Sequence, residues 1–252
     1  SNVLFPLLYQ FRTEWYRIGA PTGIYLLDDL VAGAVPPAKF TIILNAFRLS
    51  VAQIEALRRH TGRKGCVTLW MVAPGFSRGD QLSPAHIGEV TGISVREVAP
   101  RSGSITAGDG KVFANEYAAP NPMFAVADPD AEVLARYVAG GEVAVAAQRV
   151  GDGLSVYSGV LRVPSSLLRD LARRAGVHLY NEQDDVVMAG NGWLALHATT
   201  SGTHTLRLPS RSSWRDVVSG ENLGPAESLS FDLQQGDTKL LRLQGIPPNR
   251  NR

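Results

Sequence analysis

Two adjacent acids, one cysteine and five histidines are the residues here whose types and spacing could support catalysis or metal binding. Asp28 and Asp29 follow a short apolar stretch, so together they could exchange protons with a substrate or bind a metal ion. Acids in front of a short helical pattern more commonly cap that helix. We therefore expect capping as the role of this pair, with acid–base or metal chemistry as the alternative.

A nucleophile at the top of an α/β sheet requires a tight turn of the type Gly-x-Ser-x-Gly, or its cysteine counterpart. Cys66 lies in "RKGCVTL", where Lys64 and Thr68 occupy the two glycine positions. Ser158 fails the same test, because Val156 stands at the first glycine position. Cys66 also begins its predicted strand, the end opposite to that where such nucleophiles lie. We expect a structural thiol and no catalytic residue.

The histidines show no His-Glu-x-x-His or comparable spacing, so no metal site is predicted. They are His60, His86, His178, His197 and His204. The last two lie on neighbouring predicted strands across a Ser-Gly turn and could pair there, but a structural or surface role is favoured. The stretch "SGSITAGDG" has several glycines without the Gly-x-Gly-x-x-Gly spacing of a nucleotide site, so no cofactor is expected.

The best position for a small ligand or a partner is the carboxyl edge of the predicted parallel strands. The stretch "LNAFRLS" connects a buried strand to a helix, and "APGF" closes the next strand. The first stretch has no glycine, so it does not predict a phosphate-binding turn. The candidate crevice consists of Asp28, Asn45, Arg48, Pro74, Gly75 and Phe76. Its position alone does not specify a reaction.

Buried strands and amphipathic helices alternate over the residues that would carry this crevice. The pattern predicts strands at 23–29, 39–47 and 65–75, helices at 3–19, 50–61, 83–92, 128–141 and 164–176, and a hairpin at 142–160. Alternating patterns between 94 and 127 predict a β excursion from the sheet. After residue 178 the helical signals end, and short strands separated by glycine turns indicate an antiparallel domain.

Composition excludes several classes of protein. The 25 Lys and Arg residues nearly balance the 23 Asp and Glu residues, and no basic run stands out, so neither nucleic acid nor a membrane is an expected partner. No apolar run reaches membrane-spanning length, and no signal-peptide pattern is present. With a single cysteine, these features lead us to expect a cytoplasmic protein.

The order of the segments resembles the middle, trimerisation domain of family-42 β-galactosidases and related glycoside hydrolases, followed by their small β domain. The segments are "RIGAPTGIYLLDDL", "KFTIILNAFRLSVAQIEAL", "GCVTLWMVAPGF", "EVTGISV", "VYSGVLRVPSSLLRDLARRAGVHLY" and "GWLALHATTSGTHTLRLP". The resemblance covers most of residues 12–243. It implies a flavodoxin-like or glutamine-amidotransferase-like three-layer sandwich with a mostly parallel sheet over 1–178. A small antiparallel β-sandwich over 179–246 and a tail over 247–252 would follow.

The resemblance also implies what the chain lacks. The catalytic glutamates of that family lie on a (β/α)₈ barrel upstream, which does not fit into 252 residues, and the first strand of the flavodoxin-like sheet is missing. No family catalytic residue maps onto this chain, and no Cys-His-Glu triad accompanies the amidotransferase-like fold. The implied function is a non-catalytic structural and oligomerisation module of a β-galactosidase-like glycoside hydrolase.

The expected partners follow from that function: the chain itself, as a dimer or trimer, and an upstream catalytic barrel. The N-terminal helix is apolar over more than one face, and Phe5, Leu8, Phe11 and Trp15 are its candidate interface residues. The alternative is a stand-alone carbohydrate-binding or hydrolytic domain with its site at the carboxyl edge of the sheet. In that case Trp193 or Trp214 could provide a sugar-stacking surface, which requires an exposed ring.

Overall fold

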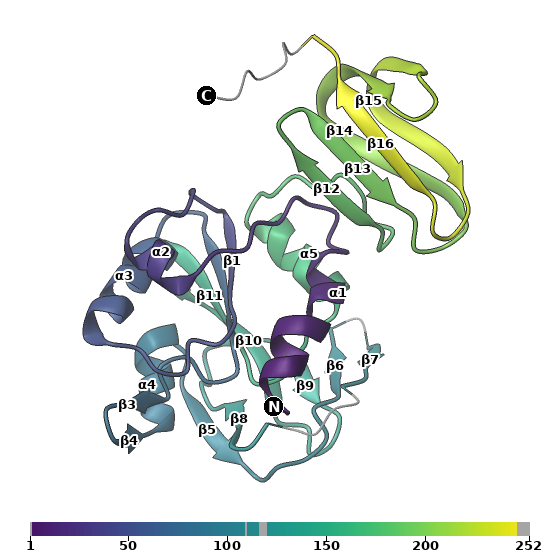
Figure 1. The fold of residues 1–252 in the computed structure, drawn as a ribbon. Helices are drawn as coiled ribbons and strands as arrows, with labels where there is room; N and C mark the ends of the chain where they lie inside the picture. The colour runs from purple at the N-terminus through teal and green to yellow at the C-terminus, as the bar shows by residue number, and fades with distance from the viewer. Residues whose placement is uncertain (1, 109, 116–119, 246–252) are drawn as a thin grey trace. The chain divides into compact units, whose positions relative to one another are not determined.

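A computed structural model describes residues 2–108, 110–115 and 120–245 of the chain. The chain divides into two compact units, each treated by itself below (Figure 1). The first unit consists of Ser1–Arg12 and Ile24–Gly176, and the second of Thr13–Gly23 and Val177–Arg252. The tail expected over 247–252 lies outside the described residues, as do residue 109 of the predicted Gly/Ser-rich loop and residues 116–119.

The first unit is built on a seven-stranded mixed sheet. Its strands, in spatial order, are β1 (Phe40–Ile43), β2 (Val67–Met71), β11 (Gly153–Ser158), β10 (Val143–Val150), β9 (Glu132–Tyr137), β6 (Ile105–Ala107) and β7 (Val112–Phe113). Two of the six pairings, β1–β2 and β2–β11, are parallel, and the other four are antiparallel. The expectation of a mostly parallel sheet is therefore wrong, because the hairpin and the β excursion supply strands to the same sheet.

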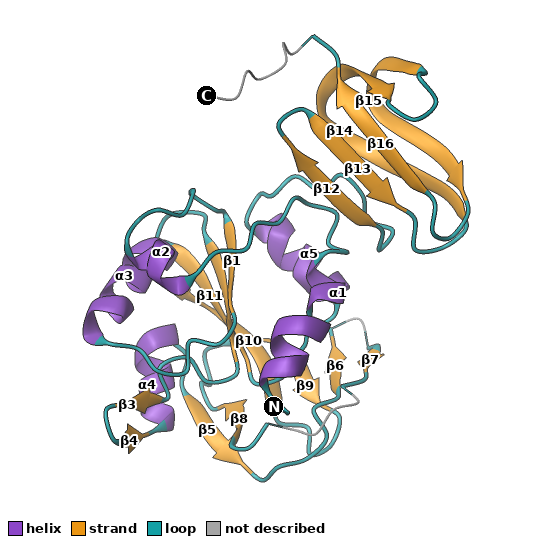
Figure 2. Ribbon diagram, viewed as in Figure 1, coloured by secondary structure: helices purple, strands orange, loops and turns teal. Residues whose placement is uncertain are grey.

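Helices lie on both sides of this sheet (Figure 2). They are α3 (Val51–Thr61) and α4 (Pro84–Thr91) on one side and α5 (Ser165–Arg174) on the other. The predicted starts of α3 and α4 are confirmed. Ser50 and Gln53 form a reciprocal capping box, and Ser83 caps α4 ahead of Pro84. The hydrophobic core beside α3 consists of Ile43, Ala46, Leu49, Ile54, Leu57, Trp70 and Val90.

Shorter elements complete the first unit. They are the π-helical turn η1 (Pro6–Gln10), α2 (Leu27–Val31), and the two-stranded ribbons β3 (Ser77–Arg78) with β4 (Gln81–Leu82) and β5 (Val95–Val98) with β8 (Met123–Val126). The short helix α1 (Arg12–Trp15) lies at the boundary, and its residues from Thr13 onward belong to the second unit. The β structure expected between 94 and 127 is thus confirmed, but β5 and β8 alone leave the main sheet, because β6 and β7 belong to it. Among the described residues, no helix has both the length and the apolar character needed to cross a bilayer.

The strand expected at 23–29 is absent from the structure. Residues 21–26 carry no regular secondary structure, and α2 begins at Leu27, so Asp28 and Asp29 lie inside a helix rather than at a strand end. Leu26 is the N-cap residue, and the two acids occupy the first turn, where carboxylates suit the positive end of the helix dipole. β1 remains the edge strand of the sheet, and residues 23–26 do not pair with its free edge.

The helix expected at 128–141 is also wrong, because this segment forms β9. Asp128 does not cap a helix; its carboxylate accepts hydrogen bonds from the backbone N–H groups of Ser94 and Asp130. β9 pairs with β10 and β6, and it buries Leu134 and Tyr137. Pairing on both sides of the strand overrides its helical propensity.

The second unit holds one antiparallel sheet of five strands. In spatial order they are β12 (Val186–Gly190), β13 (Trp193–His197), β16 (Thr238–Leu243), β14 (Gly202–Asp216) and β15 (Asn222–Leu233). The antiparallel expectation is confirmed, but the strands form a single sheet and not two stacked sheets. Register shifts near Ser212 interrupt the long β14–β15 ladder, and such bulges bend a hairpin. The sheet covers a core of Val187, Leu194, Leu196, Ala198, Leu206, Leu208, Trp214, Leu229, Leu233 and Leu241.

A segment from the start of the chain belongs to this second unit. The backbone N–H of Tyr180 donates to the carbonyl of Gly19 at 2.7 Å. Gly19 has φ +80°, and a Cβ added there would lie 1.6 Å from the carbonyl oxygen of Asn181. Only glycine permits both the conformation and this backbone approach. Residues 13–23 are therefore held against the segment that follows residue 177.

Candidate functional site

The loops that follow β1 and β2 lie side by side at the carboxyl ends of these strands. The backbone N–H of Gly75 donates to the carbonyl of Ala46 at 2.8 Å, and that of Ser77 donates to Phe47 at 3.0 Å. Arg48 and Ser77 form a parallel bridge. The structure thus brings Asn45 and Arg48 next to 74–76. We call Asn45, Arg48, Pro74, Gly75 and Phe76 the strand-end site.

Most of the strand-end site is filled by packing. Pro74 is buried, and the ring of Phe76 packs edge-on against Phe124, with the ring centroids 5.1 Å apart. The carbonyl of Phe76 accepts a hydrogen bond from the backbone N–H of Ser83, and Nδ1 of His86 lies 3.2 Å from it. These contacts close the turn and leave little of it for a ligand.

The polar members of the predicted crevice stand outside this packing. Asn45, Arg48 and Asp28 are exposed. The Nε2 atom of Gln53 donates to Asp28 over 3.5 Å, the limit of a hydrogen bond. Asp28 lies on α2 and not at a strand end, which removes the reason for placing it with the other crevice residues.

The residue that follows β2 has a strained backbone and no nucleophilic side chain. Val72 is buried with φ +65°, a left-handed conformation that is strained for a β-branched residue. Its N–H donates to Ser158 at 2.7 Å, and its carbonyl accepts from the Tyr157 hydroxyl at 2.5 Å. Burial raises the pKa of Tyr157, which keeps that hydroxyl protonated as a donor. A nucleophile elbow holds serine or cysteine in such a turn, whereas valine has no reactive atom.

Cys66 and His60, a residue of α3, take part in structural contacts. Cys66 is half-buried just before β2, and its Sγ contacts the carbonyl of Ala38 at 3.7 Å. Nε2 of His60 lies 3.3 Å from the hydroxyl of Thr41. Burial, with the nearby Arg63 guanidinium, lowers the pKa of His60. In the described parts of the chain, no three His, Cys, Asp or Glu residues come together as a metal site.

A buried histidine–aspartate pair in the second unit was not predicted from the sequence. Nδ1 of His204 lies 2.6 Å from Oδ2 of Asp185, and their side chains are 2% and 0% exposed. Nε2 of His204 faces the carbonyl of Thr200 at 3.1 Å, and Asp185 accepts from the N–H of Thr199. Both nitrogens of the ring are therefore occupied by the protein, as in a structural pair. His197 lies beside Thr238, so the two histidines are not cross-strand partners.

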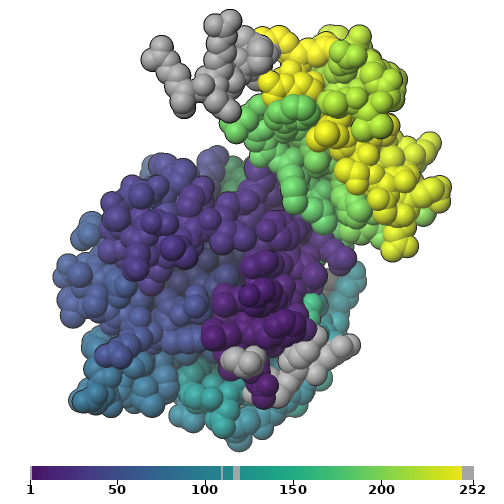
Figure 3. All heavy atoms as spheres, viewed as in Figure 1, coloured from purple at the N-terminus to yellow at the C-terminus, as the bar shows by residue number. Residues whose placement is uncertain are grey.

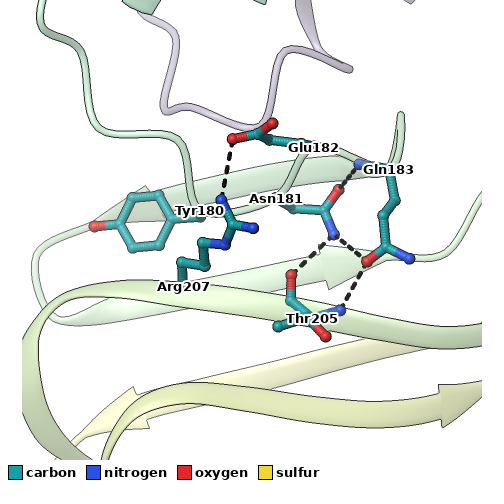
Figure 4. A pocket seen from close by; sticks show the side chains of 6 residues that line it. All are labelled: Tyr180, Asn181, Glu182, Gln183, Thr205 and Arg207. Atoms are coloured by element: carbon teal, nitrogen blue, oxygen red, sulfur yellow. Dashed lines mark hydrogen bonds and ion pairs between the residues drawn. The ribbon is translucent and has the colours of Figure 1, made fainter.

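A shallow pocket of about 260 Å³ lies in the second unit, next to β14 (Figure 4). It is lined by Tyr180, Asn181, Glu182, Gln183, Thr205 and Arg207. The Asn181 amide donates to the carbonyl of Thr205, and the Gln183 amide donates to the carbonyl of Thr203. These bonds attach the segment to β14, so both side-chain amides serve the fold.

The chemistry of this pocket is limited by its single carboxylate. Glu182 forms an ion pair with Arg207 at 3.3 Å. A glycosidase requires two carboxyl groups facing each other across the scissile bond, and the second is absent from this lining. Burial raises the pKa of Tyr180, so its phenol releases a proton even less readily near neutral pH than an exposed tyrosine does. This pocket could not be predicted from sequence patterns, because its walls come from two separate segments.

The N-terminal segment has one buried and one exposed side. Of the four predicted interface residues, Phe5 is 53% exposed, Leu8 is half-buried, and Phe11 and Trp15 are buried. Phe5 stacks on Tyr9, which is 58% exposed, with the ring centroids 5.6 Å apart. The first residues of the chain, purple in Figure 3, lie on the outside of the first unit. Phe5 and Tyr9 are therefore available for a contact, whereas Phe11 and Trp15 are part of the core.

Comparison with known proteins relates the fold to one group of enzymes. No protein-family model and no curated protein sequence matches the chain. A catalytic mutant of Gan42B, a GH42 β-galactosidase from G. stearothermophilus, has a similar structure with a TM-score of 0.62, 13% identity and 93% of this chain covered. The β-galactosidase from Rahnella sp. R3 gives 0.59, 17% and 92%, and that from Bacillus circulans sp. alkalophilus gives 0.53, 15% and 81%.

The chain spans about a third of each of these enzymes: 35%, 36% and 32% of their lengths in the same order. At these identities the likeness is one of fold. It agrees with the resemblance of the segment pattern to glycoside hydrolases of this type.

Proposed function

We propose that this chain is a non-catalytic structural and assembly part of a β-galactosidase-like glycoside hydrolase. The first unit would act as a flavodoxin-like or amidotransferase-like trimerisation domain, and the second as the small β domain that follows it. A catalytic barrel upstream would supply the two glutamates. The proposal is supported by the fold likeness to about a third of several β-galactosidases.

One observation carries the non-catalytic part of the proposal: the strained strand end at Val72 holds no nucleophile. The surrounding turn is closed by Phe76 and Phe124 and by the hydroxyl of Tyr157. In α/β sheets, ligands commonly bind at the carboxyl ends of the parallel strands, which here are the ends of β1, β2 and β11. The groups nearest to the end of β2 satisfy backbone atoms instead.

The assembly part of the proposal rests on exposed apolar side chains of the first unit. Phe5 and Tyr9 stack on the surface, and Ile24, Tyr25 and Leu26 form an exposed apolar run before α2. β1 forms one edge of the seven-stranded sheet. Apolar rings beside water favour burial against another surface. Such a surface fits a second copy of the chain or the upstream barrel.

The test is light scattering on the purified chain, with a double variant, Phe5→Ser with Tyr9→Ser, for comparison. We expect a dimer or trimer of the 27.1 kDa chain, and a shift toward the monomer in the variant. Val218→Ser, an exposed apolar position of the second unit, is the matched control and should keep the oligomer. A monomer at every concentration would contradict the assembly role. Hydrolysis of a nitrophenyl galactoside by the chain alone would contradict the non-catalytic role.

A further inference from the structure

The outer face of the second unit's sheet carries one line of residues that crosses all five strands. Gly190 on β12 pairs with Trp193 on β13, Trp193 with Arg242 on β16, Arg242 with Arg215 on β14, and Arg215 with Asn222 on β15. Directly paired residues of an antiparallel sheet share a face. We call these five residues the cross-strand row.

The row faces away from the core. The chain neighbours of its members, Leu194, Leu241 and Trp214, are buried in the core of the second unit. Alternation along a strand then places the row on the opposite face. Trp193, Arg215, Asn222 and Gly190 are exposed, and Arg242 is half-buried.

The indole of Trp193 is held in place with part of its surface open. The guanidinium of Arg242 lies 4.8 Å from the centre of the ring, and Nη1 of Arg242 donates to the carbonyl of Asn191 at 2.8 Å. Trp193 remains 42% exposed. On the other side, a Cβ added to Gly190 would meet no atom within 4 Å, so the neighbouring strand leaves space beside the indole.

The row also has a net positive charge. Among the residues that the structure describes, no carboxylate forms an ion pair with Arg215 or Arg242. The acid next to Arg215 in the chain, Asp216, lies on the inner face and pairs with Lys239 at 2.7 Å. Two guanidinium groups therefore stand on one sheet face beside an exposed indole, and neither forms an ion pair with a carboxylate in the described part of the chain.

We propose that the cross-strand row binds an acidic oligosaccharide, a chain of pyranose rings that carry carboxylates. The apolar face of one ring stacks on Trp193 in the space beside Gly190, and the guanidinium groups bind carboxylates of rings further along. Five strands span about 19 Å, which is enough for several rings. The two unpaired cations favour an acidic chain over a neutral one. A single exposed indole favours a sugar over single-stranded nucleic acid, which uses successive aromatic platforms.

The test is calorimetric titration of the whole chain with an oligogalacturonate of about six rings, a number chosen to exceed the span of the sheet. A neutral β-galactan oligomer and a single-stranded oligonucleotide of similar length are titrated alongside. We expect binding of the oligogalacturonate that weakens as salt is added, and at least about tenfold weaker binding of the neutral oligomer.

Three variants locate the site. Trp193→Ala should weaken binding by about tenfold or more, and Trp193→Phe should restore part of it. Gly190→Val should also weaken binding, because it fills the space beside the indole on a strand that tolerates a β-branched residue. Arg215→Ala should weaken binding of the oligogalacturonate. Arg211→Ala removes an equal charge outside the row and should leave that binding unchanged.

Circular dichroism of each variant establishes that its fold is retained. The proposal is overturned by absence of binding, by equal affinity for the acidic and neutral oligomers, by tighter binding of the oligonucleotide, or by binding that Gly190→Val and Trp193→Ala leave unchanged. It concerns the second unit alone, so it does not depend on the oligomeric state of the chain.

Discussion

The strand-end site of the first unit and the cross-strand row of the second unit differ in how much of their surface is open to a ligand. The strand-end site lies where α/β folds commonly bind ligands, yet its backbone groups bond to one another and its rings pack together. The row lies on the open face of an antiparallel sheet, where residues of five strands stand in a line. A favoured position in a fold therefore predicts function only when its polar groups remain unused.

The largest effect is expected from filling the turn of the strand-end site. Gly75→Ala should destabilise the first unit by about 3 kcal/mol, because Gly75 has φ +69° and the new Cβ would lie 2.6 Å from Cγ2 of Val90. Chemical denaturation measures the loss. Gly79→Ala is the control, since Gly79 has φ +59° but open space around it, and it should cost about 1 kcal/mol. Equal losses would show that the turn is not closely packed.

The next largest loss of stability is expected on the inner face of the second unit's sheet, opposite the cross-strand row. Asp216→Asn should cost about 2 kcal/mol at neutral pH, because Asp216 is buried and bonds to Lys239 and to the N–H groups of Val218 and Ser219. Glu221→Gln, an exposed acid of the same turn, should change little.

This pair also gives a pH dependence. Burial alone would raise the pKa of Asp216, but Lys239 and the two N–H groups outweigh it and hold the pKa below its ordinary value. A carboxyl with a lowered pKa contributes stability that is present above the pKa of the unfolded chain and lost as pH falls through the folded pKa. The difference between wild type and Asp216→Asn should therefore shrink below about pH 4. A constant difference down to pH 2 would contradict this account.

A smaller effect is expected at the strained end of β2. Tyr157→Phe should destabilise the first unit by about 1.5 kcal/mol, because the buried carbonyl of Val72 loses its donor. Thermal or urea unfolding measures the change. Tyr25→Phe, an exposed tyrosine of the same unit, is the control. If both variants unfold at the same temperature or urea concentration as wild type, the hydroxyl of Tyr157 does not stabilise this turn.

The smallest effect on stability is expected within the row itself. Arg215→Ala should change the free energy of unfolding by less than about 0.5 kcal/mol, because the side chain is exposed and forms no ion pair with the described residues. Its effect should instead be on binding. A large loss of stability would mean that the arginine serves the fold, as the strand-end groups do.

Local signals in the sequence predicted much of the fold. The capping box at Ser50 and Gln53, the Ser-Pro start of α4 and the Gly-Asp-Gly hairpin all depend on residues a few positions apart, and all are confirmed. The errors concern tertiary pairing. β9 has a helical pattern but is paired on both sides, and residues 23–26 have a strand pattern but pair with no strand.

For the candidate sites, too, local features could be predicted from the sequence and tertiary packing could not. The neighbouring loops of the strand-end site could be predicted because consecutive parallel strands end at one edge. The sequence did not reveal that packing closes this turn, or that Val72 adopts φ +65°. Trp193 could be singled out as an exposed-ring candidate, but its alignment with Arg242 and Arg215 depends on the register of three strands distant in sequence.

The bond between Tyr180 and Gly19 has a consequence for how this protein can be divided or inherited. Because residues 13–23 belong to the second unit while the residues on either side belong to the first, one cut near residue 177 does not separate two complete domains. A gene fragment that begins at that point would encode the five strands without the segment that holds Gly19 against Asn181. The second unit is thus unsuited to exchange between genes as a single contiguous block, and the two units are expected to have been inherited together.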